Sequence, residues 1–333
     1  MLDARAERKY ERILIVVIIA AALAVPPALL YPIFLVKIFC FAILAASFNF
    51  LLGFAGVMSF GQAALYGTAA YVTAYALKHW AMSPELAMLA GITAAVLLGV
   101  VMGALAIRRR GIYQAMITLA VAQMVYFVFV QSSFTHGEDG LQAVPRGVLF
   151  GLIDLRNDLA VYALAAIAFC SVHFGIKRLL SSQLGMMLVA VRDDERRALS
   201  LGQNAWGLKL FAFAIAAGCA GLAGSLSAVA FQLATLSGAH WHLSGEAVLM
   251  CLIGGLGTLS GPLVGAAVLV TMQHFLAPFG AWVQVLQGVV FAFCVLTFRD
   301  GIVPRRAFAW RARLRRPVMS AFAAETLEET GRS

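Results

Sequence analysis

A run of six consecutive charged side chains is the most conspicuous candidate for a functional site. The run consists of Arg192, Asp193, Asp194, Glu195, Arg196 and Arg197. Residues 186–201, which include it, predict a short amphipathic helix that Gly202 would end in a left-handed conformation. The apolar face of this helix would consist of Met187, Val191, Ala198 and Leu201. A helix of this kind, jutting from a membrane, could dock on a cytoplasmic partner, or it could be a solvated linker.

Two glycine-rich segments share the pattern G-x-x-G-x-x-S, at residues 53–59 and again at 254–260. The residues that make the pattern are Gly53, Gly56 and Ser59, and Gly254, Gly257 and Ser260. Glycine permits close approach of backbones and non-helical turns. Irregular backbone at membrane depth is tolerated only inside protein or beside a water-filled cavity, so the two segments could shape a transport pathway. Packing of helices through small residues explains the pattern equally well.

Few polar side chains interrupt the apolar stretches of the chain. The notable ones are Lys37, Asn49, Gln62, Gln114, Gln123 and Glu246. An ionisable group at the centre of a spanning helix costs roughly 2.5–3.5 kcal/mol on insertion scales, so Lys37 and Glu246 are functional candidates unless they pair or reach the interface. With the glycines and serines above, the candidates for lining a pathway also include Asn49, Gln62, Gln123 and Glu246.

Nothing in the sequence predicts catalysis, a metal site or a nucleotide site. Neither Ser59 nor Ser260 lies in a G-x-S-x-G nucleophile motif. His240 and His242 are two residues apart, so they would face away from each other on a helix, and no carboxylate or cysteine cluster accompanies them. The chain also lacks a G-x-x-x-x-G-K-[ST] motif. We therefore expect no enzyme activity, no metal and no bound cofactor, and active transport would need an ion gradient or a separate ATPase.

The elements that must position these residues are expected to be membrane-spanning helices. Hydrophobic residues make up 62% of the 333 residues and charged residues 12%, against about 45–50% and about 25% in soluble domains. This composition excludes a soluble enzyme, a disordered protein and a nucleic-acid binder. Stretches long enough to span occur near 13–31, 33–52, 56–77, 86–107, 112–131, 159–178, 209–233, 244–260, 262–278 and 281–298. We expect an all-α polytopic membrane protein with about ten transmembrane helices, of which 56–77 and 244–260 could be broken or re-entrant.

The distribution of Lys and Arg predicts that both termini are cytoplasmic. With ten spans and an inner N-terminus, most of the 25 basic residues fall in inner segments, as the positive-inside rule requires. Another apolar span follows 13–31 at once, which argues against a cleaved signal peptide. The expected organisation is a cytoplasmic N-terminus 1–12, a transmembrane domain 13–300 with an outer loop 132–158 and a cytoplasmic loop 179–208, and a cytoplasmic tail 301–333.

Several strings in the chain resemble the signature of the LivM-type permeases of branched-chain amino acid ABC importers. The longest reads SFNFLLGFAGVMSFGQAALYG at 47–67, and shorter ones read THGEDGL at 135–141, KLFAFAI at 209–215, AGLAG at 220–224 and GGLGT at 254–258. Their order and spacing hold from about 38 to 300. Three positions depart from the family pattern: His136 replaces a usual Gly, Gln62 an often-seen His and Ala216 a usual Ser. These departures bear on the solute rather than on membership of the family.

The resemblance implies the permease fold of an ABC importer in the bacterial inner membrane, for branched-chain amino acids or for related urea, amides or organic acids. It implies a LivH-type permease partner, two cytoplasmic ATPases that bind ATP and Mg²⁺, and a periplasmic or lipid-anchored solute-binding protein. The charged run would then be a coupling helix, and Glu138 and Asp139 in the outer loop would face the binding protein. A stand-alone secondary transporter or channel is the main alternative, and a membrane-embedded hydrolase is a weaker one.

Overall fold

The structure is a computed structural model of the chain. The structure describes residues 31–279 apart from 110, 150 and 152, and in addition the single positions 285, 288, 289 and 292. The expected spans 13–31 and 281–298 and both expected cytoplasmic ends lie wholly or almost wholly outside the described residues.

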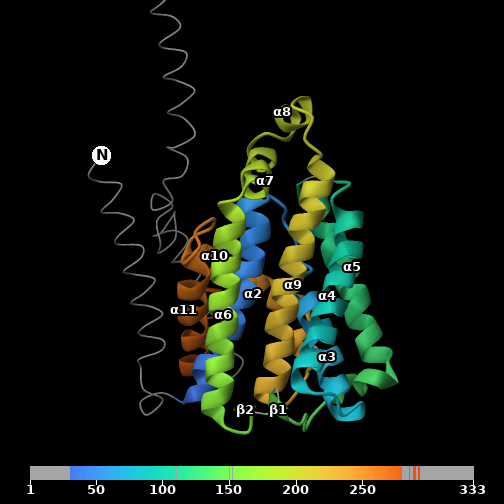
Figure 1. The fold of residues 1–333 in the computed structure, drawn as a ribbon, viewed down its shortest axis with the longest axis vertical. Coiled ribbons are helices and arrows are strands. Elements are labelled where there is room, and N and C mark those ends of the chain that lie inside the picture. The colour runs from blue at the N-terminus through green and yellow to red at the C-terminus, as the bar shows by residue number, and fades with distance from the viewer. Residues whose placement is uncertain are drawn as a thin grey trace, which may run out of the picture.

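Helices make up most of the described chain, and Figure 1 shows the long ones side by side. The α-helices are α2 (Pro32–Asn49), α3 (Gln62–His79), α4 (Pro84–Ala106), α5 (Ile112–Gln131), α6 (Asp158–Leu180), α7 (Gln183–Asp193), α8 (Glu195–Ser200), α9 (Ala205–Phe231), α10 (Trp241–Gly254) and α11 (Gly261–Leu276). A π-helical turn, η1 (Phe50–Phe54), continues α2, and the 3₁₀ turns are η2 (Ser133–Thr135), η3 (Gly137–Asp139), η4 (Leu236–Gly238) and η5 (Ala277–Phe279).

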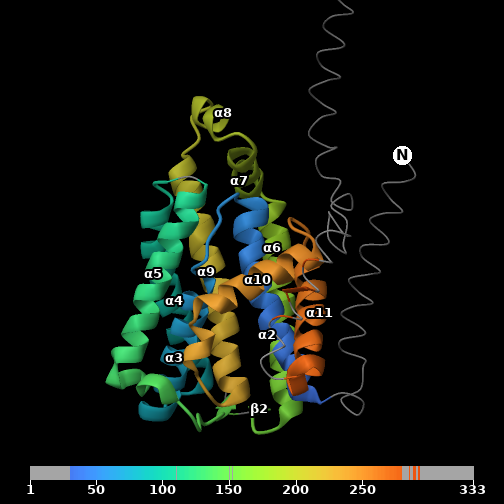
Figure 2. The same ribbon diagram turned by 180° about the vertical axis from the view of Figure 1, so that it is seen from behind.

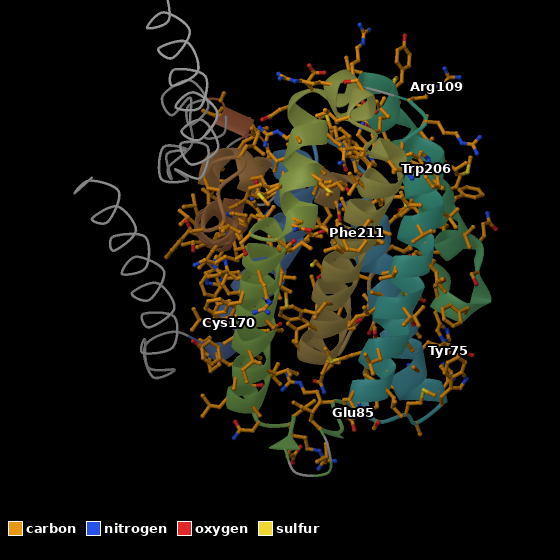
Figure 3. All side chains as sticks on the ribbon, turned by 45° about the horizontal axis from the view of Figure 1, so that its top comes forward. Tyr75, Glu85, Arg109, Cys170, Trp206 and Phe211 are labelled. Atoms are coloured by element: carbon orange, nitrogen blue, oxygen red, sulfur yellow. The ribbon has the colours of Figure 1, made fainter. Side chains whose placement is uncertain are left out.

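Five of these helices are long and apolar enough to cross a membrane. They are Pro32–Phe54, Pro84–Ala106, Ile112–Gln131, Asp158–Leu180 and Ala205–Phe231, with mean hydropathy between 1.7 and 2.3. Their outward faces carry large apolar side chains such as Leu97, Met124 and Ile167, each more than 60% exposed, which suits contact with lipid rather than water. Phe211 of α9, labelled in Figure 3, is another exposed apolar side chain.

The two stretches for which the sequence left open a broken or re-entrant helix are helical over only part of their length. The stretch 56–77 becomes α-helical at Gln62, and 244–260 ends as a helix at Gly254. With 14 residues, α10 is about 21 Å long at 1.5 Å per residue, which is shorter than the roughly 30 Å hydrocarbon core. Figure 2 shows α10 lying obliquely across the bundle, whereas its neighbours run along it.

A small hairpin departs from the all-helical expectation. Strands β1 (Val148–Leu149) and β2 (Ile153–Asp154) pair antiparallel, with Val148 opposite Asp154. Each strand has two residues, too few for an alternating pattern to be visible in the sequence. Gly147 and Gly151 take positive φ angles of 63° and 70°, which lets the chain turn at both places.

Small residues allow the helices around α9 to approach one another closely. Helix α9 packs against α2, α3 and α4. A Cβ on Gly221 of α9 would lie only 2.7 Å from that of Ala95 on α4, and the hydroxyl of Thr73 on α3 donates a hydrogen bond of 2.9 Å to Ser225 on α9. Close packing and buried hydrogen bonds of this kind hold helices together where lipid supplies no hydrophobic driving force.

The bundle has two distinct ends. Helices α7 and α8 project at one end, called here the α7–α8 end, and the strands β1 and β2 lie at the other, called here the hairpin end (Figures 1 and 2). The N-terminus of α2 and the C-terminus of α9 both lie at the hairpin end. The candidate residues fall into three groups along this axis.

Candidate functional site

The two G-x-x-G-x-x-S segments lie against each other, and Asn49 joins them. The Asn49 side chain donates from Nδ2 to the carbonyl of Thr258 at 2.6 Å, and its Oδ1 accepts the N–H of Gly257 at 2.8 Å. A Cβ on Gly53 would lie 2.9 Å from the Cα of Gly257. We call residues 49–61 and 254–261 together the glycine junction. Sequence reasoning had singled out both segments but had not predicted that they touch.

Special backbone conformations make this contact possible. The chain leaves α2 through the π-helical turn η1 and then reverses at Gly56, whose φ is 70°. On the opposing segment, Gly255 and Gly257 have φ angles of 113° and 75°. L-amino acids with a side chain rarely adopt such angles, so glycine is required at these three positions.

Two of the other polar candidates in or beside the junction, Ser59 and Gln62, accept hydrogen bonds. Ser59 is buried and its Oγ accepts the N–H of Gly61 at 3.2 Å. The hydroxyl of Ser47 donates to Oε1 of Gln62 at 2.9 Å. Ser260 is half-buried at the start of α11. These contacts make the junction a packed joint between segments of the bundle rather than an open channel wall.

The charged run does not form the single helix predicted for 186–201. Asp194 takes an extended conformation, with φ −154° and ψ 98°, and separates α7 from α8. Its carboxylate accepts the N–H of Arg197 at 3.1 Å and so caps α8, an interaction that competes with continuation of α7. Leu201, placed on the apolar face, is 74% exposed. Gly202 has the expected positive φ, at 79°.

Two of the six charged residues bind the bundle, and the others are exposed. Arg192 donates from Nη1 to the carbonyl of Gly53 in the glycine junction, and a Cβ on Gly56 would lie 2.7 Å from Arg192 Cγ. Glu195 pairs with Lys209 of α9 at 2.9 Å. The exposed residues are Asp193, Asp194, Arg196 and Arg197. The α7–α8 end therefore combines a solvent-facing charged surface with a direct contact to the junction.

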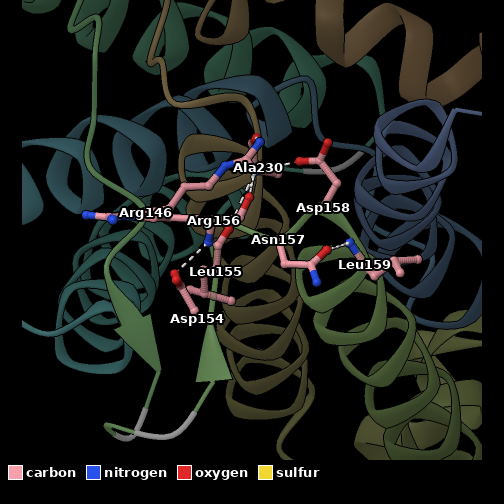
Figure 4. Close-up of polar contacts among 8 residues, drawn as sticks. All are labelled: Arg146, Asp154, Leu155, Arg156, Asn157, Asp158, Leu159 and Ala230. Atoms are coloured by element: carbon pink, nitrogen blue, oxygen red, sulfur yellow. Dashed lines mark hydrogen bonds and ion pairs between the residues drawn. The ribbon is translucent and has the colours of Figure 1, made fainter.

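Arg146 organises the hairpin end, and sequence reasoning missed it. Its guanidinium pairs with Asp158 at 2.6 Å and donates to the carbonyl of Ala230, the penultimate residue of α9, at 2.7 Å (Figure 4). The Arg146 side chain is 9% exposed. The signal available in the sequence was its position, because basic residues are scarce in the predicted outer loops. Of the expected docking residues, Asp139 is exposed, and Glu138 lies with it in η3.

A cavity of about 730 Å³ lies between α2, α3, α5, the end of α9 and α10, towards the hairpin end. Its lining includes Lys37 and Glu246, the two ionisable residues that the sequence placed inside apolar stretches. Of the pathway candidates, all of which are described, Glu246 alone lines this cavity. Gln123 is half-buried on α5 and is also absent from the lining.

The described residues contain no cluster that could hold a metal ion, since no three His, Cys, Asp or Glu side chains converge. His240 and His242 instead lie at the start of α10, where His240 Nδ1 accepts the N–H of His242 at 3.4 Å. The arrangement offers a joint, a solvent-facing charged surface and a cavity, which suits movement of a solute rather than chemistry on it.

Comparison with known proteins assigns a class to this arrangement. The family described as "Branched-chain amino acid transport system / permease component" matches residues 30–296. The high-affinity branched-chain amino acid transport system permease proteins LivM of Salmonella typhimurium and of Escherichia coli are each 26% identical over 292 residues, covering 79% of this chain and 68% of the relative. No solved structure matches.

Proposed function

Because the chain belongs to the branched-chain amino acid permease family, we propose that it forms half of the translocation path of an ATP-driven importer. The family and the five apolar helices make it a multi-pass membrane protein and a transport subunit, not an enzyme. The proposal extends this to about ten spans in the bacterial inner membrane with both termini in the cytoplasm. The excess of Lys and Arg in the predicted inner segments supports that orientation.

The proposed assembly contains a second, LivH-type permease, two cytoplasmic ABC ATPases and a periplasmic or lipid-anchored solute-binding protein. The ATPases would bind ATP and Mg²⁺, since this sequence has no P-loop motif. The solute is a branched-chain amino acid or a related small molecule such as urea, an amide or an organic acid. Support for the amino acid comes from the two LivM relatives, whose names describe high-affinity branched-chain amino acid transport.

The contact between Arg192 and Gly53 is the observation that carries the coupling mechanism. In this mechanism the exposed residues Asp193, Asp194, Arg196 and Arg197 seat α7 and α8 in an ATPase groove. Closure of the ATPases on ATP moves α7 and α8 as a rigid body. Arg192 then transmits the movement to the glycine junction, where α2 and η1 meet the segment between α10 and α11.

Reconstitution tests this function. The chain is placed in liposomes with the second permease, both ATPases and the binding protein, and ATP-driven uptake is measured over leucine, isoleucine, valine, urea and short amides. Replacing the residues from Arg192 to Arg197 by Ala and Gly should leave ATP hydrolysis but abolish uptake. Lys177→Ala, an exposed change on α6, is the matched control. Normal coupled uptake by the six-residue variant would contradict the docking role.

The alternative, a stand-alone secondary transporter or channel, makes a different prediction. Under it, the purified chain alone would take up solute in response to an ion gradient, and omission of the ATPases would have no effect. Uptake that needs ATP and every other subunit excludes this alternative.

A further inference from the structure

We propose that the cavity between Lys37 and Glu246 is a solute site that selects a zwitterion, with Lys37 receiving a carboxylate and Glu246 an ammonium group. This inference rests on the proposed transport function and deepens it by naming the residues and the charge pattern that would recognise the solute. At about 730 Å³ the cavity falls within the range of about 300–1,000 Å³ typical of small-molecule sites.

The two charges approach the cavity from different helices. Lys37 lies on α2, five residues after its first residue, and Glu246 lies in the second turn of α10. No ion pair joins them, although both line the cavity. The Lys37 ammonium sits 5.9 Å from the centroid of the Phe41 ring and makes no ion pair with any described residue. A carboxylate entering the cavity would place a counter-charge beside the Lys37 ammonium.

Glu246 is oriented by neutral and weakly basic neighbours. Its Oε1 accepts a hydrogen bond of 2.8 Å from Nε2 of Gln273 on α11, and Nδ1 of His242 lies 3.7 Å away. The Glu246 side chain is 14% exposed. A carboxylate so placed keeps lone pairs available, and an ammonium group is the partner that would satisfy them best in a partly desolvated site.

Beside the polar residues Ser227, Thr235, Ser237, His240 and His242, much of the remaining lining is apolar and suited to an aliphatic side chain. The apolar and aromatic residues around the cavity include Phe41, Tyr66, Tyr126, Phe231, Leu233 and Leu243. A solute with both charges at one end and a hydrocarbon chain at the other would therefore match the cavity in charge and in polarity. A solute with only one charge would leave Lys37 or Glu246 facing a like charge or no charge, which disfavours its binding.

The cavity also lies where a solute would arrive. Several lining residues, from Leu233 to His240, belong to the segment after α9. That segment pairs with the loop before the hairpin, since Leu141 and Ala234 form an isolated bridge. In the proposed orientation this end faces the binding protein.

Direct binding separates this site from the specificity of the binding protein. The complex of the two permeases and the ATPases is purified without the binding protein, and binding of radiolabelled leucine is measured in competition with leucinamide, which lacks the carboxylate, and with 4-methylpentanoate, which lacks the amine. The wild-type complex should prefer leucine over both. Lys37→Met and Glu246→Gln should each weaken leucine binding about tenfold or more, because each removes a charged partner.

The selectivity of the variants distinguishes recognition from a folding defect. Lys37→Met should gain relative affinity for leucinamide, and Glu246→Gln for 4-methylpentanoate, whereas misfolding would weaken all ligands together. Lys177→Met removes an exposed charge at the far end of α6 and should bind leucine like the wild type. Unchanged leucine affinity and unchanged selectivity in both cavity variants would overturn the zwitterion site.

Failure of the transport function would look different. If the full wild-type assembly imports only urea or uncharged amides, the importer function is supported and the zwitterion site is contradicted. If it imports nothing with ATP, the proposed function itself falls, and the site falls with it.

Discussion

The glycine junction and the cavity both contain polar residues within apolar stretches, yet they differ in almost every physical respect. In the junction, Asn49 is buried and its amide is satisfied by two backbone groups of the opposing segment. In the cavity, the ionisable side chains of Lys37 and Glu246 line an open volume. A satisfied amide between backbones holds segments in register, whereas charges that face a cavity are available to a ligand. These contacts suit the junction to a mechanical role and, under the proposal above, the cavity to recognition of a solute.

Enlarging Gly53 should have the largest effect, because the junction has no room for a side chain. A Cβ there would lie 2.8 Å from Asn49 Oδ1 and 2.9 Å from the Gly257 backbone. We expect Gly53→Val to lower the free energy of unfolding by about 3 kcal/mol and to abolish uptake. Thermal unfolding of the purified complex and uptake in liposomes measure the two effects. Wild-type uptake would contradict the packed joint.

Gly175→Ala is the matched control for that change. Gly175 lies within α6, and a Cβ added to it would meet nothing within 4 Å. We expect Gly175→Ala to raise stability slightly, by about 0.5 kcal/mol, because alanine is the better helix former, and to leave uptake unchanged.

Removing the amide at position 49 tests the junction without adding volume across it. Asn49→Leu would leave the Gly257 N–H and the Thr258 carbonyl without their partner. We expect the free energy of unfolding to fall by about 2 kcal/mol, since buried polar groups without a hydrogen-bond partner destabilise the folded state. Thermal unfolding of the purified complex measures this change. Gln123→Leu, at a half-buried position outside the junction, should cost much less. Equal losses of unfolding free energy in Asn49→Leu and Gln123→Leu would show that the Asn49 hydrogen bonds do not stabilise the junction.

Arg192→Lys sharpens the mechanical role by keeping the charge and removing the planar guanidinium. Lysine cannot reproduce the guanidinium geometry at the Gly53 carbonyl. We expect ATP hydrolysis to continue while uptake per ATP falls several-fold. Arg178→Lys, an exposed change on α6, is the control. A wild-type ratio of uptake to hydrolysis in Arg192→Lys would show that the contact is not needed for coupling.

Arg146→Gln is expected to have the smallest destabilising effect, although the residue is more buried than most charges. The side chain of its partner Asp158 is 44% exposed, so solvent screens the ion pair and reduces its contribution to stability. We expect a loss of about 1 kcal/mol, mostly from the uncapped carbonyl of Ala230. Arg156→Gln, an exposed change nearby, should be neutral. A loss like that of Gly53→Val would place a second rigid joint at the hairpin end.

The sequence predicted the helices better than it predicted their interruptions. The span expected at 112–131 coincides with α5, because twenty consecutive, mostly apolar residues leave little freedom in a bilayer. The single helix at 186–201 was wrong because the Asp194 carboxylate caps the following turn, a local interaction that hydrophobic periodicity does not report. The hairpin was missed because its strands are too short to show a pattern.

The candidate sites were predicted by residue type but not by grouping. Lys37 and Glu246 stood out because charge is rare in apolar stretches, yet only the fold brings them to one cavity. Arg192 was expected to face a partner, and it turns inward to Gly53 instead. Arg146 was overlooked because its partners are a carboxylate beyond the hairpin and a carbonyl at the end of α9, which no spacing rule connects.

The bonds of Asn49 also constrain how such permeases can be recombined. The side-chain amide of Asn49 forms hydrogen bonds with the backbone of residues 257 and 258, which lie more than 200 positions further along the chain. A chimera could join the first half of this chain to the second half of a relative. It would keep these hydrogen bonds only if the relative has a glycine at the position equivalent to Gly257. Both segments of the glycine junction should therefore come from the same parent. Hybrid proteins with a crossover between the two segments are expected to fold poorly.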